Sequence, residues 1–265
     1  MHSHQFKNNE IFKDKNVLVV GGGNSACDIA VEVSRVAKKT HISMRRGYHF
    51  IPKFLMGIPS DKYYAKTVWI PKRIRLFLQK LILRFVQGSY ENYGLQKPDH
   101  DILEAHATVN SELLYFIKHG KITPKVDIDF FSESSAIFKD GSKESYDYVM
   151  YATGYKITFP FLDQSIADYE NTDVDLYNLC FHPNINNLMF VGLIQPLGCI
   201  WPLSDLQSQL IAKYLKGKWK LPADLQRAIK HQKENKTFDF IDTPRHKLEV
   251  DYHEFAAHLK KEIQV

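Results

Sequence analysis

The stretch 16-NVLVVGGGNSACDIA-30 decides the fold of the first half of the chain. Residues 16–20 are dense in branched apolar side chains, as in a strand buried on both faces of a parallel sheet. Gly21, Gly23 and Ala26 follow in the spacing G-x-G-x-x-A. This spacing is typical of a tight turn that brings backbone amides close to a pyrophosphate and lets the next helix pack on the strand. We expect that helix over residues 24–37, with its N-terminus toward the phosphates.

Two arginines follow the next predicted strand. The segment 40-THISMRR-46 ends in Arg45 and Arg46, near the position where an NAD-specific fold carries an acid for the ribose hydroxyls. A guanidinium pair suits a 2′-phosphate, which favours NADPH over NADH. The sequence thus indicates an α/β, Rossmann-like NADPH-binding domain. Two alternatives remain: a close-packed turn without a ligand, and arginines that are only solvated at a strand end.

Length, composition and charge limit the classes of protein to which this chain can belong. A chain of 265 residues with 44% hydrophobic content can form one large domain or two modest ones. A net charge of +5 without a long basic run argues against a nucleic-acid binder. Cys27, Cys180 and Cys199 form no C-x-x-C pair, so we expect neither a disulfide framework nor a metal site. With no signal-peptide pattern or membrane-spanning run, we expect a cytoplasmic protein.

An aromatic and basic insertion, at about residues 48–98, interrupts the alternation of strands and helices. Pro71 opens a predicted helix with apolar residues at helical spacing. They are Ile74, Phe77, Leu78, Leu81, Ile82 and Phe85. We expect this helix to pack on its own domain; the alternative is that it covers a ligand site or contacts an anionic membrane surface.

Short strands return after Pro98. We predict strands at residues 126–131 and 148–152, and a hairpin turn at Asp140-Gly141 between two strand-like runs. The second strand delivers Thr153, Gly154 and Tyr155 to the edge where ligands of open α/β sheets bind. From about residue 159 we expect a strand at 188–191, a helix after Pro202 with Ser204 or Asp205 as its cap, and an amphipathic C-terminal helix.

Together these pieces resemble the flavin-containing monooxygenase family, class B flavoproteins related to Baeyer-Villiger monooxygenases. The matching segments, in order, are VLVVGGGNSACDIA, SMRRG, AIFKDGS, YATGYKITFPFLD, FVGLIQPLGCIWPLSDLQ and RHKLEVDY. His2 and Phe6 match the last part of the family's hinge fingerprint. In that family an FAD-binding half precedes this segment, so the resemblance implies that this half is absent here or is a separate partner.

The resemblance implies a domain organisation and a set of cofactor contacts. Residues 1–15 would be a hinge, 16–155 the NADPH-binding domain, and 156–265 the C-terminal part of an FAD-binding domain. NADPH would lie across Gly21, Gly23, Asn24 and Ser25, with Arg45 and Arg46 on its 2′-phosphate. The remaining implied cofactor contacts are Thr153, Gly154 and Tyr155 near both cofactors, and Gln195 and Leu197 beside the flavin.

The implied reaction belongs to the flavin. NADPH would reduce FAD, and the reduced flavin would take up O2 to form a peroxyflavin that oxygenates a soft nucleophile, an amine nitrogen or a sulfide. No catalytic side chain is assigned, because this chemistry needs no triad and no metal. The alternatives are a non-catalytic NADPH-binding fragment or decayed relative, and an NADPH-dependent disulfide reductase, against which the lack of C-x-x-C counts.

Overall fold

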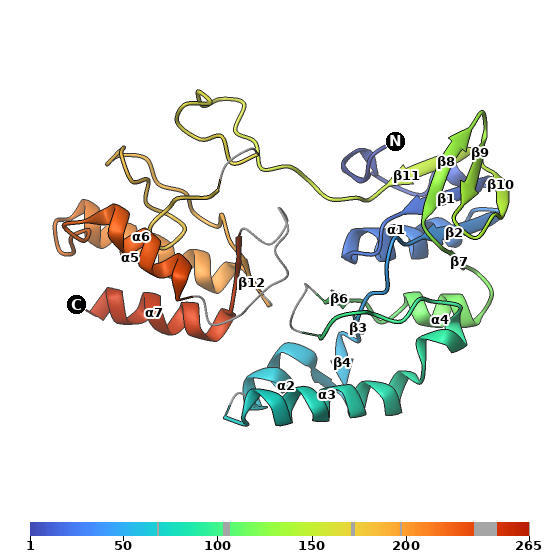
Figure 1. Ribbon diagram of the computed structural model, residues 1–265, viewed down its shortest axis with the longest axis horizontal. Helices are drawn as coiled ribbons and strands as arrows, with labels where there is room; N and C mark the ends of the chain where they lie inside the picture. The colour runs from blue at the N-terminus through green and yellow to red at the C-terminus, as the bar shows by residue number, and fades with distance from the viewer. Residues whose placement is uncertain (68, 103–106, 171–172, 197, 236–247, 265) are drawn as a thin grey trace. The chain divides into compact units, whose positions relative to one another are not determined.

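The structure is a computed structural model that describes all residues except 68, 103–106, 171–172, 197, 236–247 and 265. The chain divides into two compact units (Figure 1). The described part of unit 1 contains Met1–Ile102 and Ala107–Tyr155, and that of unit 2 lies within Lys156–Val265. Among the described residues, none of the helices has the length and apolar content needed to cross a bilayer.

Unit 1 is built on a four-stranded parallel sheet in the order β11-β1-β2-β7. Its strands are β1 Asn16–Val20, β2 Lys39–Ser43, β7 Thr123–Lys125 and β11 Tyr148–Tyr151. Successive side chains of a strand point to opposite faces. Val17 and Val19 therefore pack in the cluster with α1, while Leu18 packs on the other side against Ala136 and Phe138. The predicted strand buried on both faces is confirmed.

Helix α1 (Asn24–Ser34) follows β1 directly, as predicted, but ends three residues early. The amides of Arg35 and Val36 bond to carbonyls three residues back, which tightens the last turn and closes the helix. Beside it lies α4 (Leu113–Lys118), whose Leu113, Leu114 and Ile117 are buried. Both helices share one apolar core with β1 and β2.

The other face of β1 is covered by an antiparallel sheet of three strands. These are β8 Ile128–Ser132, β9 Ser135–Phe138 and β10 Lys143–Ser145. The predicted turn at Asp140-Gly141 joins β9 to β10, and Gly141 has a φ of 81°, which glycine adopts without strain. The strand predicted at 126–131 begins two residues later.

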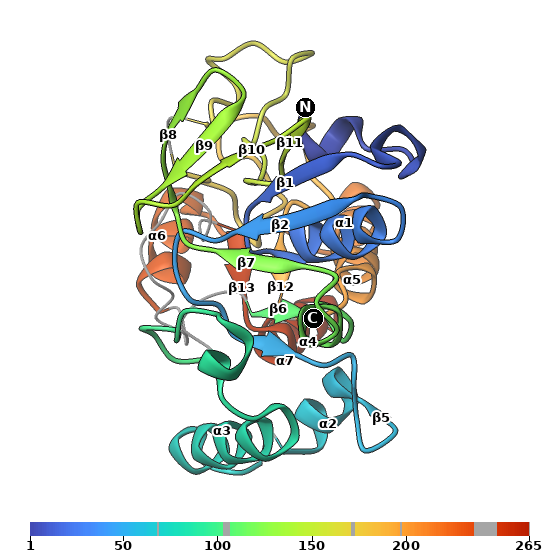
Figure 2. The same ribbon diagram turned by 90° about the vertical axis from the view of Figure 1, so that its right-hand side faces the viewer.

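The insertion lies at one edge of unit 1 (Figure 2). Its β3 (Phe50–Ile51) pairs with β6 (Thr108–Val109), and a short hairpin follows. The remaining elements are β4 Phe54–Leu55, β5 Ile58–Pro59, α2 Ser60–Thr67, α3 Lys72–Gln87 and a 3-10 turn at Tyr90–Tyr93. The predicted start of α3 after Pro71 is confirmed. The expectation that its apolar stripe packs on its own domain is wrong: Phe77 and Phe85 are exposed, whereas Arg75 and Leu83 are buried.

Unit 2 contains three helices and two short strands among its described residues. Its elements are β12 Gln195–Pro196, α5 Trp201–Leu215, α6 Leu225–Glu234, β13 Glu249–Val250 and α7 Tyr252–Gln264. The three helices meet around Leu210, Ile229 and Leu259. β12 and β13 pair in parallel. The C-terminal amphipathic helix is confirmed.

Two local predictions in unit 2 are wrong. Residues 188–191 form only a single bridge, between Met189 and Phe181, because these residues lie beside a loop rather than a strand that could extend the pairing. Neither Ser204 nor Asp205 caps α5. The helix begins earlier, after Ile200, and the Ser204 hydroxyl instead donates back to the Ile200 carbonyl at 3.2 Å.

Candidate functional site: a nucleotide-binding turn

The turn between β1 and α1 can be made only from small residues. Gly21 has a φ of 136°, and a Cβ there would lie 2.5 Å from the Ala152 carbonyl oxygen on the neighbouring strand end. A Cβ at Gly22 would lie 2.2 Å from Cε2 of Tyr48. Both distances are far below carbon contact distances of about 3.5–4.0 Å. The G-x-G-x-x-A spacing identified Gly21, but gave no reason for a glycine at position 22.

The N-terminus of α1 carries no side-chain cap. Gly23 is the N-cap residue, with extended backbone, and Asn24 and Ser25 begin the first turn in exposed positions. Amides of a first helical turn have no intrahelical partner, and the helix dipole adds positive character there. Ala26 is fully buried against the sheet, as the motif requires. This end of α1 can therefore accept a phosphate.

The side chain of Asn24 already has a partner. Its Oδ1 accepts a hydrogen bond of 2.8 Å from the Val109 amide of β6. The predicted contact of Asn24 with NADPH is therefore available only through its backbone amide or its amide nitrogen. Its carbonyl oxygen fixes the turn instead.

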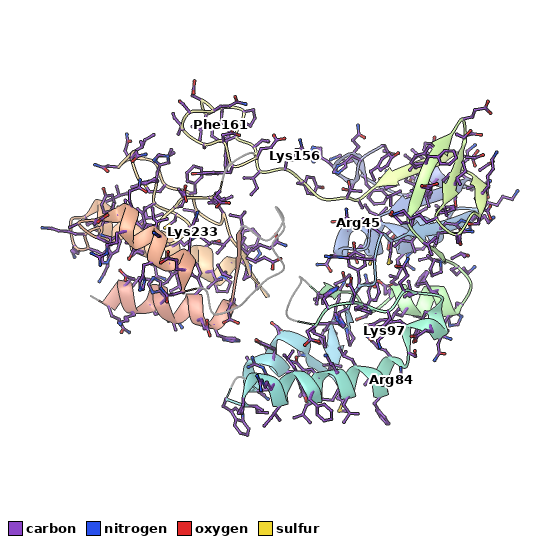
Figure 3. The ribbon with its side chains drawn as sticks, viewed as in Figure 1. Arg45, Arg84, Lys97, Lys156, Phe161 and Lys233 are labelled. Carbon is purple, nitrogen blue, oxygen red and sulfur yellow. The ribbon has the colours of Figure 1, made fainter. Side chains whose placement is uncertain are left out.

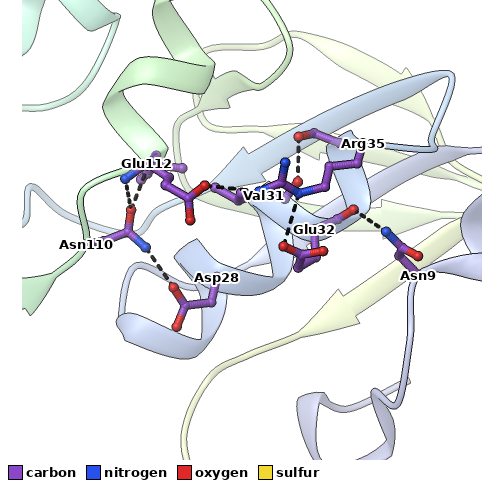
Figure 4. Close-up of polar contacts among 9 residues, drawn as sticks. Asn9, Asp28, Val31, Glu32, Arg35, Asn110 and Glu112 are labelled. Atoms are coloured by element: carbon purple, nitrogen blue, oxygen red, sulfur yellow. Dashed lines mark hydrogen bonds and ion pairs between the residues drawn. The ribbon is translucent and has the colours of Figure 1, made fainter.

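Residues 108–110 hold the turn from outside, and sequence reasoning missed them. The Thr108 hydroxyl donates to the Gly22 carbonyl at 2.8 Å. Asn110 donates through Nδ2 to Asp28 of α1 at 2.8 Å (Figure 4). Asn110 Oδ1 also accepts from the amides of Glu112 and Leu113, at the start of α4. An Asn two or three residues before an apolar helix is a capping signal that could have been found; the contact with Asp28 could not.

A second set of polar contacts ties α1 to α4. The Arg35 guanidinium bonds to Glu32 at 3.1 Å and to Glu112 at 3.0 Å, and Asn9 donates to the Glu32 carbonyl (Figure 4). These pairs are exposed, so each adds little stability by itself. Together with Asn110 they fix the direction of α1 relative to the loop over the turn.

Arg45 and Arg46 follow the carboxyl end of β2, at the same sheet edge as the glycine turn. Arg45 is exposed (Figure 3). Arg46 is half-buried, its guanidinium lies 5.8 Å from the Tyr48 ring centroid, and its Nε is buried without a hydrogen-bond partner among the described residues. A buried donor without an acceptor is costly, so this atom calls for an anionic or polar partner.

A small cavity adjoins Arg46. It is lined by Arg46, Tyr48 and Lys125, among other residues. Lys125 ends β7, paired in register with Ser43 of β2, but its amine lies against the antiparallel sheet, 3.5 Å from the Ser142 hydroxyl and 5.3 Å from the Phe138 ring centroid. The Lys125 side chain is mostly buried, and its nearest carboxylate oxygen, on Glu144, is 3.8 Å away. The cationic character of this edge therefore comes from Arg45 and Arg46, as the sequence indicated.

Burial shifts the pKa values of His41 and Cys27 in unit 1. Burial, reinforced by Lys39 and Lys125, lowers the pKa of His41 to about 4, and its Nδ1 lies 2.6 Å from the Tyr146 hydroxyl. Burial raises the pKa of the Cys27 thiol, behind the glycine turn. A thiol held protonated is a poor nucleophile, so Cys27 gives no support to a disulfide reductase.

Thr153, Gly154 and Tyr155 are exposed at the carboxyl end of β11. The segment 1–5 lies against them: His2 Nε2 is 3.2 Å from the Gly154 carbonyl, and the Ser3 hydroxyl is 3.3 Å from the Tyr155 hydroxyl. The His2 and Tyr155 rings pack edge to face, with centroids 5.2 Å apart. The N-terminal segment therefore positions the loop that leaves the sheet beside Gly21.

The structure thus brings most of the predicted cofactor residues to one sheet edge in unit 1. These are Gly21, Gly23, Asn24, Ser25, Arg45, Arg46, Thr153, Gly154 and Tyr155. Gln195 belongs to unit 2, where it is half-buried in β12 and pairs with Glu249. Leu197 lies outside the described residues. Contact of each of these residues with a cofactor stays a prediction.

The profile of the flavin-binding monooxygenase-like family matches residues 1–265. The chain belongs to this family. The resemblance inferred from the glycine motif and the segments after it is therefore confirmed. Flavin-containing monooxygenase 5 of Rattus norvegicus is 36% identical over 95% of the chain and 49% of its own length. Dimethylaniline monooxygenase [N-oxide-forming] 2 of Oryctolagus cuniculus is 34% identical over 99% of the chain and 51% of its own length.

The chain spans about half the length of these curated relatives of the flavin-binding monooxygenase-like family. Two solved structures share its fold. S-allyl-L-cysteine S-oxygenase from Allium sativum superposes with a TM-score of 0.60 at 23% identity, over 100% of this chain and 48% of that one. The open crystal structure of cyclohexanone monooxygenase superposes with a TM-score of 0.66 at 11% identity, over 98% of this chain and 66% of that one. The expected α/β class with a parallel sheet is confirmed.

Proposed function

We propose that this flavin-binding monooxygenase-like chain binds NADPH in unit 1 and is part of an FAD-dependent monooxygenase that oxygenates a soft nucleophile. The observation that carries the proposal is the buried Nε of Arg46, without a partner among the described residues, at the strand end next to an uncapped helix N-terminus. A 2′-phosphate supplies the acceptor that Arg46 lacks, and a pyrophosphate suits the amides of the first turn of α1.

The residues present fit NADPH in a second respect. Gly21 and Gly22 leave no side chain over the turn, and the Thr108 hydroxyl fixes the Gly22 carbonyl by a hydrogen bond of 2.8 Å. The backbone can thus approach a pyrophosphate closely. Arg45, exposed beside Arg46, adds a second positive charge for the 2′-phosphate.

When bound, NADPH supplies a hydride and FAD supplies the ring that accepts it and activates O2. The role of this chain is to bind and orient the two cofactors. The turn and α1 hold the pyrophosphate, Arg45 and Arg46 select the phosphorylated ribose, and the Thr153–Tyr155 loop, braced by His2 and Ser3, borders the same edge. Gln195 of β12 is proposed to lie beside FAD.

The substrate class follows from the relatives. The name of the Oryctolagus cuniculus relative states that it forms an N-oxide from a dimethylaniline, a nucleophilic nitrogen. An amine nitrogen or a sulfide is accordingly the class proposed here. Both are small electron-rich nucleophiles, and their oxygenation requires no acid or base from the chain.

The test is a calorimetric titration of the chain with NADPH and with NADH. Charge-assisted hydrogen bonds contribute about 1.5–3 kcal/mol, so Arg46→Gln should weaken NADPH binding about 10- to 100-fold and leave NADH unchanged. Arg227→Gln, an exposed arginine of unit 2, is the matched control and should change neither. Equal affinity for NADPH and NADH in the unsubstituted chain would refute the proposal.

A further inference from the structure

The ring of Tyr48 lies beside both halves of the proposed nucleotide site. A Cβ at Gly22 would lie 2.2, 2.5 and 2.6 Å from three atoms of this ring, Cε2, Cδ2 and Cζ, so the ring occupies the space next to the glycine turn. The guanidinium carbon of Arg46 lies over the same ring, 5.8 Å from its centroid. One aromatic side chain therefore adjoins the turn proposed for the pyrophosphate and the arginine proposed for the 2′-phosphate.

The surrounding chain holds the Tyr48 ring in place. The ring is half-buried and packs against the apolar core that α1 shares with β1 and β2. The preceding residue, Gly47, is buried, and a Cβ there would lie 2.4 Å from the Lys97 carbonyl carbon and oxygen, which leaves this backbone little room to move. Two residues after Tyr48 the chain enters β3, which pairs with β6. The ring is therefore a rigid surface.

The Arg46 side chain is less restrained. Its Nε is buried without a hydrogen-bond partner among the described residues. The carboxylate of Asp99 bonds to His100 at 2.8 Å, and this bond, more than the charge of Arg46, lowers the pKa of Asp99. An arginine has many rotamers, and fixing it on a ligand costs conformational entropy. The contact with the Tyr48 ring therefore matters for where the guanidinium lies before a ligand binds.

A ring face restrains a guanidinium without using its hydrogen-bond donors. The cation is attracted to the π electrons when it lies within about 6 Å of the ring centroid. The N–H bonds lie in the guanidinium plane, and this attraction does not occupy them as a carboxylate partner would. Arg46 thus keeps its charge and its donors for an anionic ligand. An arginine that is already held in position loses less entropy when it binds that ligand.

We propose that Tyr48 is a positioning residue that sets the preference of this site for a 2′-phosphate. Its ring, anchored beside Gly22, holds the Arg46 guanidinium toward the phosphorylated ribose. The inference rests on the proposed function and adds to it a residue that does not itself bind the phosphate. The ring and not the hydroxyl carries the effect, because ring atoms make the contacts with Gly22 and Arg46.

The experiment is a calorimetric titration of Tyr48 variants with NADPH and with NADH, in which the ratio of the two affinities is compared. Tyr48→Leu keeps an apolar side chain beside Gly22 but has no π face. The ratio should therefore fall about 3- to 30-fold, the range expected for a cation–π contact at a partly desolvated site. Tyr48→Phe keeps the ring and should keep the ratio. A change that merely loosens the turn, or leaves a fraction of the chain unfolded, weakens both dinucleotides alike and leaves the ratio unchanged.

Two controls separate this role from a general effect on packing. In an Arg46→Gln background, Tyr48→Leu should lower the ratio no further, since Tyr48 acts through Arg46. Tyr148 is the matched tyrosine: it is half-buried and packs against the same core, but it begins β11, at the sheet edge opposite the glycine turn. Tyr148→Leu should leave the ratio unchanged, whatever its effect on the free energy of unfolding.

Three results would overturn the proposal. One is an unchanged ratio in Tyr48→Leu; another is an equal loss in Tyr48→Phe, which would assign the effect to the hydroxyl. The third is a further fall of the ratio in the Arg46→Gln background, which would mean that Tyr48 acts without Arg46. Each of these results leaves NADPH binding in unit 1 standing. Equal affinity of the unsubstituted chain for both dinucleotides would instead refute the proposed function, and this inference with it.

Discussion

Replacing Gly22 by alanine tests how the nucleotide-binding turn is built. The added Cβ would lie 2.2, 2.5 and 2.6 Å from Cε2, Cδ2 and Cζ of Tyr48, so the ring must move by more than 1 Å to reach a normal contact. The backbone behind the ring has little freedom, because a Cβ at Gly47 would itself meet the Lys97 carbonyl carbon and oxygen at 2.4 Å. Gly22 does not have a positive φ, so alanine brings no backbone strain.

The expected cost of Gly22→Ala therefore arises from overpacking, about 1–3 kcal/mol in the free energy of unfolding. Part of it is offset by the lower entropy of the unfolded alanine chain, about 0.4–1 kcal/mol. In a Tyr48→Ala background the ring is gone, and the same substitution should be neutral or stabilising. A double-mutant cycle by urea denaturation measures this coupling, which we expect to exceed about 1 kcal/mol. An equal cost in both backgrounds would refute the steric reasoning.

Three further predictions concern buried polar groups. The pKa of His41 is lowered to about 4, so as the pH falls the unfolded chain takes up a proton on His41 at a higher pH than the folded chain does. The free energy of unfolding should therefore fall between pH 6.5 and 4, by up to about 3 kcal/mol. In urea denaturation, a His41→Gln variant should show a flatter dependence of this free energy on pH. Asn110→Ala should lower the free energy of unfolding by about 1–2 kcal/mol, since it removes the acceptor at the start of α4 and the hydrogen bond to Asp28. It should also weaken NADPH binding in the calorimetric titration. An unchanged free energy of unfolding would contradict this role of Asn110. Gln207 is fully buried and bridges the Gly192 amide and the Asn178 carbonyl, so Gln207→Leu should cost about 2–4 kcal/mol by leaving both unpaired; a loss below 1 kcal/mol would count against it.

The elements predicted best are those whose cause is local. β1, the glycine turn and the start of α1 follow from a short run of apolar residues and a fixed spacing, and Pro71 and Asp140-Gly141 mark their elements by backbone geometry alone. The family resemblance placed most candidate residues at one sheet edge, which is where the carboxyl ends of parallel strands meet.

The features missed depend on contacts between distant residues. The sequence around Gly22 does not indicate that the Tyr48 ring lies over this glycine. It also does not indicate that Thr108 and Asn110, about eighty residues later, form hydrogen bonds to the turn and to α1. The strand predicted at residues 188–191 failed for the same reason, since an apolar run becomes a strand only when another strand pairs with it.

Helix α3 shows the limit of periodicity most clearly. The spacing of Ile74, Phe77, Leu78 and Leu81 predicts an amphipathic helix, and the helix is there. Periodicity says that one face is apolar but does not say what that face meets. The burial of Arg75 and Leu83 shows that the insertion uses the other face.

The first turn of α1 and the arginines after β2 are proposed to form one NADPH site. A crystal structure of the chain with NADP⁺ tests it most directly. We expect the pyrophosphate at the amides of Asn24 and Ser25 and the 2′-phosphate within hydrogen-bond distance of Arg46. A dinucleotide bound elsewhere, or one whose 2′-phosphate lies in solvent away from Arg45 and Arg46, would contradict it.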